Sequence, residues 1–362
     1  MNVLLLRANP RKTGQTQQLI ELFVQGLRET PARVVDVDLP TRTLLPCMGC
    51  FHCWLTTPGQ CVHGDDMSGL LDQVLEADVL VCATPMYHFS MSSYLKAFFE
   101  RTFPLLKQGL TESGLGGTRN SLRYPERWQG KKLITLVTGA LRGMEPFRPV
   151  NDTFRLIADS LDLELAGQLT RPESYLIDYP FSKPKTLKRI RTAFIQAGRE
   201  AGTTGRLSTE TVADAALPLS TDEERFRTYS NLYWIEAEAL GQDGLVPTVV
   251  QARVAGDVRI LMREMVRTFD ARAGARLKVV LQFDFPDQEL HYHVAIDHGQ
   301  CRLDEGSVAR PDLRVQCPSR VWAGIFTRQT DVREALREKQ LVIEGDKSLF
   351  TRLDRFFPPP SA

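Results

Sequence analysis

The chain lacks a net charge of either sign and has no long hydrophobic run. Its 362 residues carry 45 lysines and arginines against 44 aspartates and glutamates, so the formal net charge is +1. This balance gives no electrostatic reason to expect nucleic acid or an acidic membrane as a partner. The first apolar run, residues 1–6, ends at Arg7 and is too short for a signal-peptide core or a membrane span. We therefore expect a cytoplasmic protein with no membrane span and no nucleic-acid partner.

The sequence also lacks the three spaced glycines of a dinucleotide-binding turn, since only Gly14 lies between a predicted strand, 1–8, and a predicted helix, 15–28. A loop that leads from a parallel strand into a helix N-terminus favours anions, because free N–H groups and the helix dipole point at the ligand. A monophosphate such as that of FMN fits this loop better than a pyrophosphate. The alternative is an ordinary turn capped by Thr13 or Thr16. The candidate phosphate-binding residues are Asn9, Arg11, Thr13, Gly14, Gln15 and Thr16.

Cysteine is sparse except in one segment. Seven occur, and four of them are spaced Cys-x2-Cys-x2-Cys-x7-Cys. In a chain expected in the cytoplasm, such clustering favours metal, cluster or redox chemistry over a disulfide framework. The spacing suits a [4Fe–4S] cluster held by Cys47, Cys50, Cys53 and Cys61, whereas zinc usually takes two separated Cys-x2-Cys pairs. Zinc, a redox-active disulfide and simply packed thiols remain as alternatives.

Strand and helix patterns alternate along the first half of the chain. Buried strands are expected at 1–8, 34–37, 79–83, 133–137 and 163–169, and helices at 15–28, 68–77, 92–103, 146–161 and 183–201. This alternation predicts an α/β fold, a flavodoxin-like doubly wound five-stranded parallel sheet with helices on both faces. We expect an FMN-binding domain over 1–205, a helical connector over 206–245, and an α+β domain with antiparallel strands over 246–362.

Two further loops follow strands of the predicted parallel sheet, at the same edge as the phosphate loop. A flat isoalloxazine ring needs an apolar floor and N–H donors for its pyrimidine edge. Met86, Tyr87 and Phe89 can supply the floor. Backbone N–H groups around Tyr87 and His88, and around Gly139 and Ala140, can supply the donors. For His88, a surface position without a catalytic role is the simpler interpretation. The candidate ring-binding residues are Pro85, Met86, Tyr87, His88, Phe89, Thr138, Gly139 and Ala140.

Two motifs carry a family resemblance over about residues 1–200. Asn-Pro-Arg-x-x-Gly-x-Thr from Asn9, and Pro-Met-Tyr-x-x-x-Met-Ser-x-x-x-Lys-Ala-Phe-x-Glu-Arg from Pro85, look like the NAD(P)H-dependent FMN reductases and iron–sulfur flavoproteins of the flavodoxin-like superfamily. The resemblance implies an FMN that is reduced by NADH or NADPH and reoxidised by a quinone, a metal, oxygen or another redox partner. It also implies a homodimer or homotetramer.

The cysteine segment resembles that family in one part and departs from it in another. Its four cysteines are followed by Gly64-Asp65-Asp66-Met67, an ensemble that resembles the cysteine motif of the iron–sulfur flavoproteins. Residues 51–54 and 57–59 instead look closer to a subgroup of flavin reductases that share the cysteines without an obvious need for a cluster. A loop presenting Phe51 and Trp54 could cover the flavin instead.

The last part of the chain, about 250–357, resembles the sterol carrier protein fold. The residues that carry this resemblance are the run 306–315 with Pro311-Asp312-Leu313, and Gly345-Asp346, where Asp346 can cap the last helix. The resemblance implies an apolar tunnel for a lipid-like or other hydrophobic molecule. The simpler interpretation of each apolar residue is a place in the core. The candidate lining residues are Met262, Met265, Phe269, Trp322 and Phe326.

Together these patterns predict an FMN-dependent NAD(P)H oxidoreductase that passes electrons to a quinone-like or other hydrophobic small-molecule acceptor. Two other functions stay open. The four cysteines would suit an electron carrier or a redox-sensing flavoprotein. The fused C-terminal domain would suit a lipid-binding protein in which the flavin domain is secondary.

Overall fold

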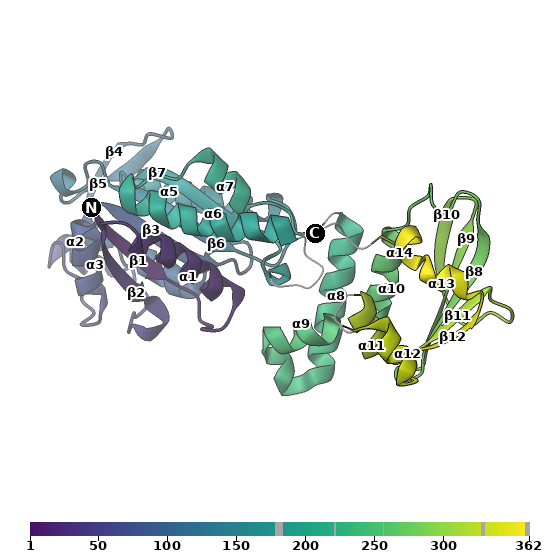
Figure 1. Ribbon diagram of the computed structural model, residues 1–362. Helices are drawn as coiled ribbons and strands as arrows, with labels where there is room; N and C mark the ends of the chain where they lie inside the picture. The colour runs from purple at the N-terminus through teal and green to yellow at the C-terminus, as the bar shows by residue number, and fades with distance from the viewer. Residues whose placement is uncertain (178–183, 221, 256, 327–329, 359–362) are drawn as a thin grey trace. The chain divides into compact units, whose positions relative to one another are not determined.

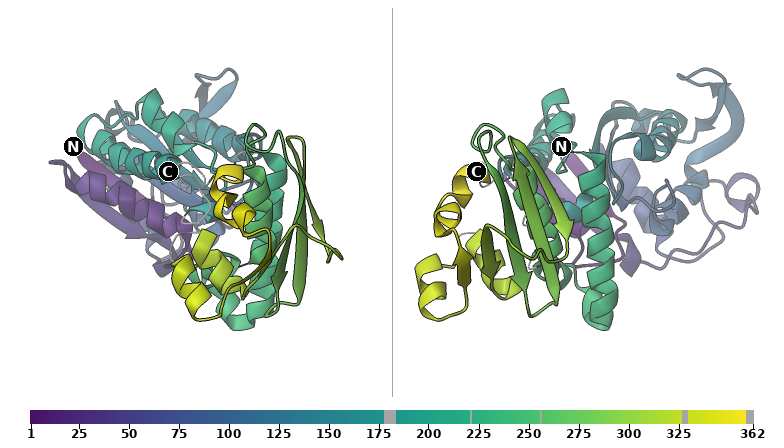
Figure 2. Two further views of the ribbon diagram at one scale, coloured as in Figure 1. Left: turned by 45° about the vertical axis from the view of Figure 1, so that its right-hand side comes forward. Right: turned by 90° about the vertical axis from the view of Figure 1, so that its right-hand side faces the viewer.

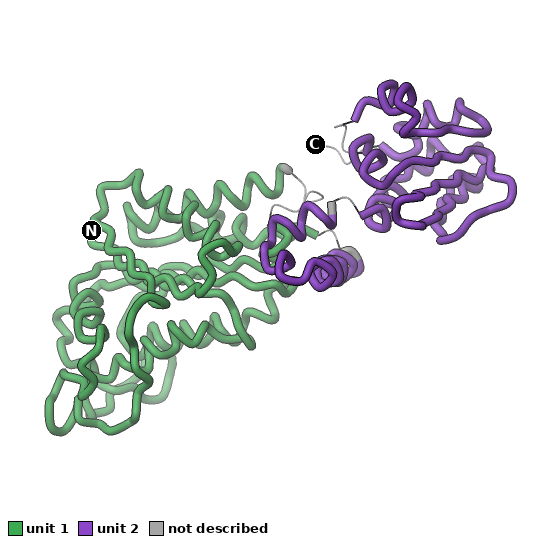
Figure 3. Tube along the Cα trace, turned by 90° about the horizontal axis from the view of Figure 1, so that it is seen from below, with its two compact units in different colours: residues 1–178, 184–223 green, residues 179–183, 224–362 purple. Residues whose placement is uncertain are grey.

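The computed structural model describes residues 1–177, 184–220, 222–255, 257–326 and 330–358. Its described residues form two compact units, one ending at residue 223 and the other beginning at 224 (Figure 3). The predicted connector, 206–245, is therefore divided between the two units. Along the described residues, no helix combines the length and the apolarity that a membrane crossing requires.

The first unit is built on a five-stranded parallel sheet with strand order β2-β1-β3-β6-β7. Its strands are β1 (Asn2–Arg7), β2 (Arg33–Asp38), β3 (Val79–Pro85), β6 (Lys132–Thr138) and β7 (Glu164–Arg171). All seven residues of β3 are buried, as expected for a central strand covered on both faces. This is the flavodoxin-like order, in which the chain reverses direction across the sheet between β1 and β3. The predicted fold is thus confirmed.

Helices cover both faces of the parallel sheet. They are α1 (Gln15–Arg28), α3 (Met67–Glu76), α4 (Ser93–Glu100), α5 (Arg148–Ser160), α6 (Pro184–Thr203) and α7 (Thr209–Ala215). The helices α1 and α6 lie side by side (Figure 1). On the opposite face, α3, α4 and α5 share one apolar cluster with the sheet, which includes Leu71, Phe98 and Phe154. The loops after β1, β3 and β6 follow the carboxyl ends of neighbouring parallel strands, so they share one edge of the sheet.

One hairpin of the first unit was not predicted. The strands β4 (Leu106–Glu112) and β5 (Thr118–Leu122) pair antiparallel with each other and belong to neither large sheet. Six of the seven β4 residues are exposed, so the segment has no alternation of apolar and polar residues for a sequence pattern to detect.

The second unit carries a sheet with strand order β10-β9-β8-β11-β12. Its strands are β8 (Lys278–Phe285), β9 (Leu290–Asp297), β10 (Gln300–Glu305), β11 (Leu313–Gln316) and β12 (Val342–Gly345). The predicted α+β domain with antiparallel strands is present, but the sheet is mixed at one pair: β11 runs parallel to β8, with Leu313 opposite Leu281. The reason is the connection after β10, residues 306–312, which brings the chain back along β8 so that β11 begins opposite Leu281 and runs in the same direction.

Helices of the second unit gather on one face of the mixed sheet, which Figure 2 shows for the last part of the chain. The unit's helices are α8 (Glu223–Leu240), α9 (Pro247–Ala255), α10 (Val258–Arg267), α11 (Ser319–Phe326), α12 (Val332–Arg337), α13 (Lys347–Thr351) and α14 (Leu353–Phe356). The core joins α10 residues such as Leu261 to the inward side chains of β8 and β9, including Phe283 and Val294. The last helix predicted from the sequence is split into α13 and α14.

Candidate functional site

The N-terminus of α1, where the phosphate loop ends, is open. Gly14 is the N-cap residue, no side chain caps the helix, and the first turn holds no acidic residue. The first N–H groups of α1 therefore have no intrahelical acceptor. Arg11 and Thr13 are exposed, and a Cβ built at Gly14 would lie 3.7 Å from Arg11 Nε. The loop thus offers free N–H groups and one positive charge to an anion.

Two of the predicted phosphate-loop residues lie beneath the loop. Asn9 is 2% exposed, and its Nδ2 donates to the carbonyl oxygen of Arg11 at 2.9 Å and to Gln17 Oε1 at 2.8 Å. Gln15 is also buried. Asn9 therefore stabilises the loop from its buried side.

The loops after β1, β3 and β6 are tied into one edge. The hydroxyl groups of Thr16, in the first turn of α1, and Thr138, at the end of β6, lie 2.6 Å apart. The N–H of Met86 donates to the carbonyl oxygen of Thr138 at 2.7 Å. The Ser92 hydroxyl donates to the carbonyl oxygen of Ala8 at 2.8 Å. These contacts bring predicted residues from three loops together at the point where the strand order reverses.

The loop after β3 presents two exposed aromatic side chains on a tight turn. Tyr87 and Ser90 exchange both backbone hydrogen bonds, and His88 and Phe89 between them have positive φ angles of 45° and 62°. Tyr87 is 46% exposed and Phe89 is 51% exposed. Because the Tyr87 N–H already donates within the turn, it is not the free donor that the sequence suggested. Within the described chain, the His88 N–H donates to no protein acceptor.

The loop after β6 is close-packed at Gly139. A Cβ built there would lie 2.8 Å from two ring carbons of Phe147 and 3.1 Å from Met86 Cε, so only glycine fits. The Gly139 N–H donates to the carbonyl oxygen of Arg171 at 3.0 Å and is likewise not free. Ala140 is exposed and lies next to it. Met86, Gly139 and Thr138 thus form one contact surface, although two of the expected backbone donors are already engaged.

A buried glutamate that the sequence analysis missed holds this loop in place. Glu173 is 1% exposed and has a positive φ of 52°, a conformation that costs energy and points to a role. Its N–H donates to the carbonyl oxygen of Leu141, and its carboxylate accepts the N–H groups of Leu219 and Ser220. Arg142 completes the contact, with Nε 3.3 Å from Glu173 Oε1. No local pattern marks Glu173, because its partners are far away in sequence.

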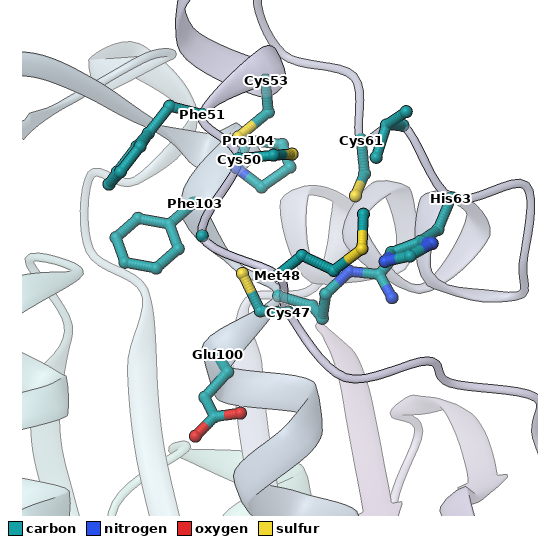
Figure 4. A pocket seen from close by; sticks show the side chains of 13 residues that line it. Cys47, Met48, Cys50, Phe51, Cys53, Cys61, His63, Glu100, Phe103 and Pro104 are labelled. Carbon is teal, nitrogen blue, oxygen red and sulfur yellow. The ribbon is translucent and has the colours of Figure 1, made fainter.

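The four clustered cysteines lie around one small cavity (Figure 4). Cys50 is exposed, Cys53 is buried, Cys47 and Cys61 are half-buried, and all four are free thiols. Burial raises the pKa of the Cys53 thiol, and its neighbours Cys61, Cys50 and Cys47 add to this rise. The structure therefore brings together the cysteines that the sequence singled out.

The donor set at this cavity consists of four thiols that are not drawn together around one point. In the described ranges, no three His, Cys, Asp or Glu side chains are grouped so that they could hold a metal ion. The ligands of a [4Fe–4S] cluster lie farther apart, because each sulfur binds a different iron. Four thiols around one cavity fit that requirement in type and number. Two buried nitrogens at the cavity, Arg101 Nε and His63 Nε2, have no hydrogen-bond partner among the described residues. The cavity encloses about 20 Å³, room for one water molecule, so the exposed loop would have to open for a cluster.

The second unit contains a larger cavity, of about 860 Å³, between its helices and the sheet. This volume lies within the range of small-molecule sites. Of the five predicted lining residues, Met265, Trp322 and Phe326 line it. Met262 instead belongs to the closed core, and Phe269 packs against that core. The other apolar lining residues are Ile325, Val332, Leu336, Ile343, Phe350, Leu353 and Phe357.

Comparison with known proteins agrees with the two units. Residues 1–148 match the family described as NADPH-dependent FMN reductase, and residues 268–358 match the SCP-2 sterol transfer family. An iron–sulfur flavoprotein of Archaeoglobus fulgidus is 27% identical over 110 residues, which cover 30% of this chain and 49% of that protein. The chain thus spans about half the length of this relative.

Two longer alignments involve named oxidoreductases. An FMN-dependent NADH:quinone oxidoreductase of an Exiguobacterium species is 27% identical over 207 residues, 46% of this chain and 98% of that protein. The solved structure of an FMN-dependent NADH-azoreductase from Bacillus anthracis aligns with a TM-score of 0.42 and 12% identity, over 56% of this chain and 98% of that one. Both resemblances expected from the sequence are confirmed: the first unit is similar to the NADPH-dependent FMN reductases, and the second to the SCP-2 sterol transfer family.

Proposed function

We propose that this protein is an FMN-dependent NAD(P)H oxidoreductase with a quinone-like or other hydrophobic acceptor. The observation that carries the proposal is the joined edge of the first unit, where the Thr16 and Thr138 hydroxyls lie 2.6 Å apart beside the uncapped N-terminus of α1. The match of residues 1–148 to the NADPH-dependent FMN reductases supports it. We expect the protein to act in the cytoplasm as a homodimer or homotetramer.

The phosphate of FMN would be bound by the N-terminus of α1. The free N–H groups of the first turn, the hydroxyl groups of Thr13 and Thr16, and the guanidinium of Arg11 supply donors and positive charge. Asn9 supports the loop through its bonds to Arg11 and Gln17. Gly14 and Gln15 form the start of the helix at this point.

The flavin ring would lie against the loops after β3 and β6. When bound, FMN supplies hydride and electron transfer between a nicotinamide and an acceptor. Met86, Tyr87 and Phe89 give the ring an apolar surface, and the N–H groups of His88 and Ala140 remain to bind its polar edge. Pro85 and Gly139 hold these loops close together.

Two observations support a quinone-like or other hydrophobic acceptor, one from a relative and one from the second unit. The relative aligned over 98% of its own length is named an FMN-dependent NADH:quinone oxidoreductase. The cavity of about 860 Å³ has mostly apolar walls, so it suits a hydrophobic or lipid-like molecule. The same cavity also supports the second candidate, a lipid-binding protein with a secondary flavin domain.

A direct experiment is to purify the full chain and measure its absorption and its released cofactor. We expect one FMN per chain and rapid anaerobic bleaching of the flavin bands by NADH or NADPH, followed by reoxidation with a soluble quinone. Thr16→Val should lower FMN retention, whereas Thr111→Val, exposed in the β4–β5 hairpin, serves as the matched control. Full FMN retention by Thr16→Val would contradict the site. A chain without FMN would leave lipid binding as its function.

The cysteine segment supports a different candidate, an electron carrier or redox-sensing flavoprotein with a [4Fe–4S] cluster on Cys47, Cys50, Cys53 and Cys61. When bound, such a cluster supplies one-electron transfer. Iron and sulfide analysis after anaerobic purification tests its presence. Bleaching of the flavin only by a protein donor, and not by NADH or NADPH, would favour the carrier over the enzyme.

A further inference from the structure

The loop that carries the four cysteines is closed at its base. The Asp66 carboxylate accepts the N–H of Thr43 at 2.8 Å, and the Asp66 N–H donates to the carbonyl oxygen of Thr43 at 3.2 Å. One step further in, the Asp65 carboxylate accepts the N–H of Leu45 at 2.9 Å. The cysteine loop therefore begins at 43–45 and ends at 65–66, with all four cysteines between.

A buried ion pair fastens this base to the body of the unit. Arg101 follows the last turn of α4, and its Nη1 and Nη2 donate to the two oxygens of Asp65 at 2.8 and 2.9 Å. Nη1 also donates to the carbonyl oxygen of Leu45 at 2.6 Å. The two side chains are 1% and 3% exposed. Arg101 thus holds both ends of the cysteine loop at once, in the planar two-point geometry that lysine cannot reproduce.

The electrostatics of the pair match this arrangement. Burial alone would raise the pKa of Asp65, but the hydrogen bonds from Arg101 and from the N–H groups of Leu45 and Met67 outweigh it and lower the pKa to about 2. Asp65 therefore stays ionised, and the pair remains intact throughout the neutral range.

The positive end of the pair faces the cysteines. Arg101 lines the cavity together with Cys47, Cys50, Cys53 and Cys61, whereas Asp65 does not line it. The Arg101 side chain also contacts Cys61. Its Nε–H is buried and meets no acceptor within the described chain. A group held by four thiolates is strongly negative, and a buried negative charge needs a nearby compensating charge.

We propose that Asp65 and Arg101 are positioning residues for the cysteine site: the pair closes the loop, and Arg101 supplies the buried positive charge next to the four sulfur atoms. The part concerning charge rests on the proposed [4Fe–4S] cluster. The part concerning loop closure is independent of the cluster and of the FMN site, because the thiols of the metal-free protein report on it.

Three variants of the full chain separate closure from charge. Arg101→Lys keeps the charge but loses the two-point contact with Asp65. Arg101→Gln removes both. Asp65→Asn with Arg101→Gln replaces the ion pair by two amides, which can still bridge the loop ends without charge. Lys96→Gln, on the same helix and 51% exposed, is the matched control. Retained FMN and an unchanged circular dichroism spectrum show that the first unit is folded.

The first measurement is the rate at which a thiol reagent such as DTNB labels the metal-free protein. We expect Arg101→Gln to increase by at least tenfold the labelling rate of Cys53, which is buried in the parent. The double amide variant should restore most of the protection, and Lys96→Gln should match the parent. Unchanged labelling of a folded Arg101→Gln protein would overturn the closure role. If Arg101→Gln does not fold, labelling of the double variant and of Arg101→Lys still decides this.

The second measurement is the midpoint potential of the cluster after anaerobic reconstitution. Loss of the positive charge disfavours the more negative reduced state, so Arg101→Gln, which keeps the Asp65 carboxylate, should have a lower potential than the parent. The double variant loses both charges of the pair and should shift less. We expect a tenfold shift in the ratio of reduced to oxidised cluster, which is 59 mV for one electron. Arg101→Lys should stay near the parent value. An unchanged potential would overturn the charge role. If the parent takes up no iron and sulfide, the cluster proposal fails and the charge role with it, while the labelling result still stands.

Discussion

The two units provide for a ligand in different ways. The first unit has a joined edge, where three loops meet through short contacts such as the 2.6 Å between the Thr16 and Thr138 hydroxyls. The second unit has a cavity of about 860 Å³ with largely apolar walls. The first arrangement selects a ligand by charge and by the direction of its hydrogen bonds, and the second selects by volume and apolar surface. The difference matches a phosphate-bearing flat cofactor at one and a hydrophobic molecule at the other.

The difference follows from the two sheets. In the first unit, helices cover both faces of a parallel sheet, and large side chains such as Phe98, Phe154 and Trp128 are buried beside it. Ligands can then reach only the edge where the strands end. In the second unit, the short helices α11–α14 lie on one face of the sheet, and the cavity lies among their side chains.

The largest expected effect is on the joined edge. Gly139→Val would place a methyl-bearing Cβ 2.8 Å from the Phe147 ring and push the loop after β6 outward. Overpacking of this kind costs typically about 1–3 kcal/mol, so we expect FMN to bind roughly 5- to 140-fold more weakly. Fluorescence titration with FMN measures the change. Gly69→Ala, where a Cβ meets nothing within 4 Å, should bind FMN as the parent does.

The second expected effect is on the cavity alone. Leu336, 42% exposed, lines the cavity, so Leu336→Trp should take up part of its volume. Displacing two methylene groups of a bound chain costs about 1.6 kcal/mol, at about 0.8 kcal/mol each, which is roughly tenfold in affinity. Titration with a fluorescent long-chain fatty acid measures this. Leu110→Trp, exposed in the β4–β5 hairpin, is the control. Equal weakening by both variants would show that the probe binds outside the cavity.

The comparison also shows what the sequence could reveal. The apolar strands, and the loops that end them, predicted the joined edge, because parallel strands bring distant loops such as those at Gly14 and Gly139 to one side. Which backbone donors stay free was not predictable. The N–H of Tyr87 is engaged by a turn and that of Gly139 by Arg171, and both depend on loop geometry. In the second unit, the crossover that makes β11 parallel to β8 leaves no local pattern.

Contacts between segments that are distant in the sequence were also not predictable. The exposed hairpin β4–β5 has no apolar alternation, and Glu173 gives no sign in the sequence of its partners Leu219 and Ser220. Arg101 ends a motif quoted for its family resemblance, yet its contact with Asp65, 36 residues away, becomes visible only in the fold. The buried ion pair therefore became apparent only in the structure, whereas the ends of the strands were predicted from the sequence.

The smallest expected effect tests whether the two ligand sites are independent. Arg142 touches Glu173 at 3.3 Å, Ser220 Oγ at 3.1 Å and Glu223 at 3.2 Å, so it links the loop after β6 to the residues that lead into α8. Arg142→Met should weaken FMN binding roughly fivefold, since a partly exposed ion pair contributes about 1 kcal/mol or less. Glu173 keeps its bonds from Leu219 and Ser220, which limits the loss.

The same Arg142 variant decides how separate the units are in function. Arg142→Lys keeps the charge and should recover part of the FMN affinity, whereas Arg148→Met, 71% exposed with its side-chain charge 3.5 Å from Glu145, is the control and should change nothing. If the sites are independent, the fatty-acid affinity of Arg142→Met equals that of the parent. A parallel loss of FMN and fatty-acid binding would mean that the segment leading into α8 transmits the state of the flavin loop to the cavity.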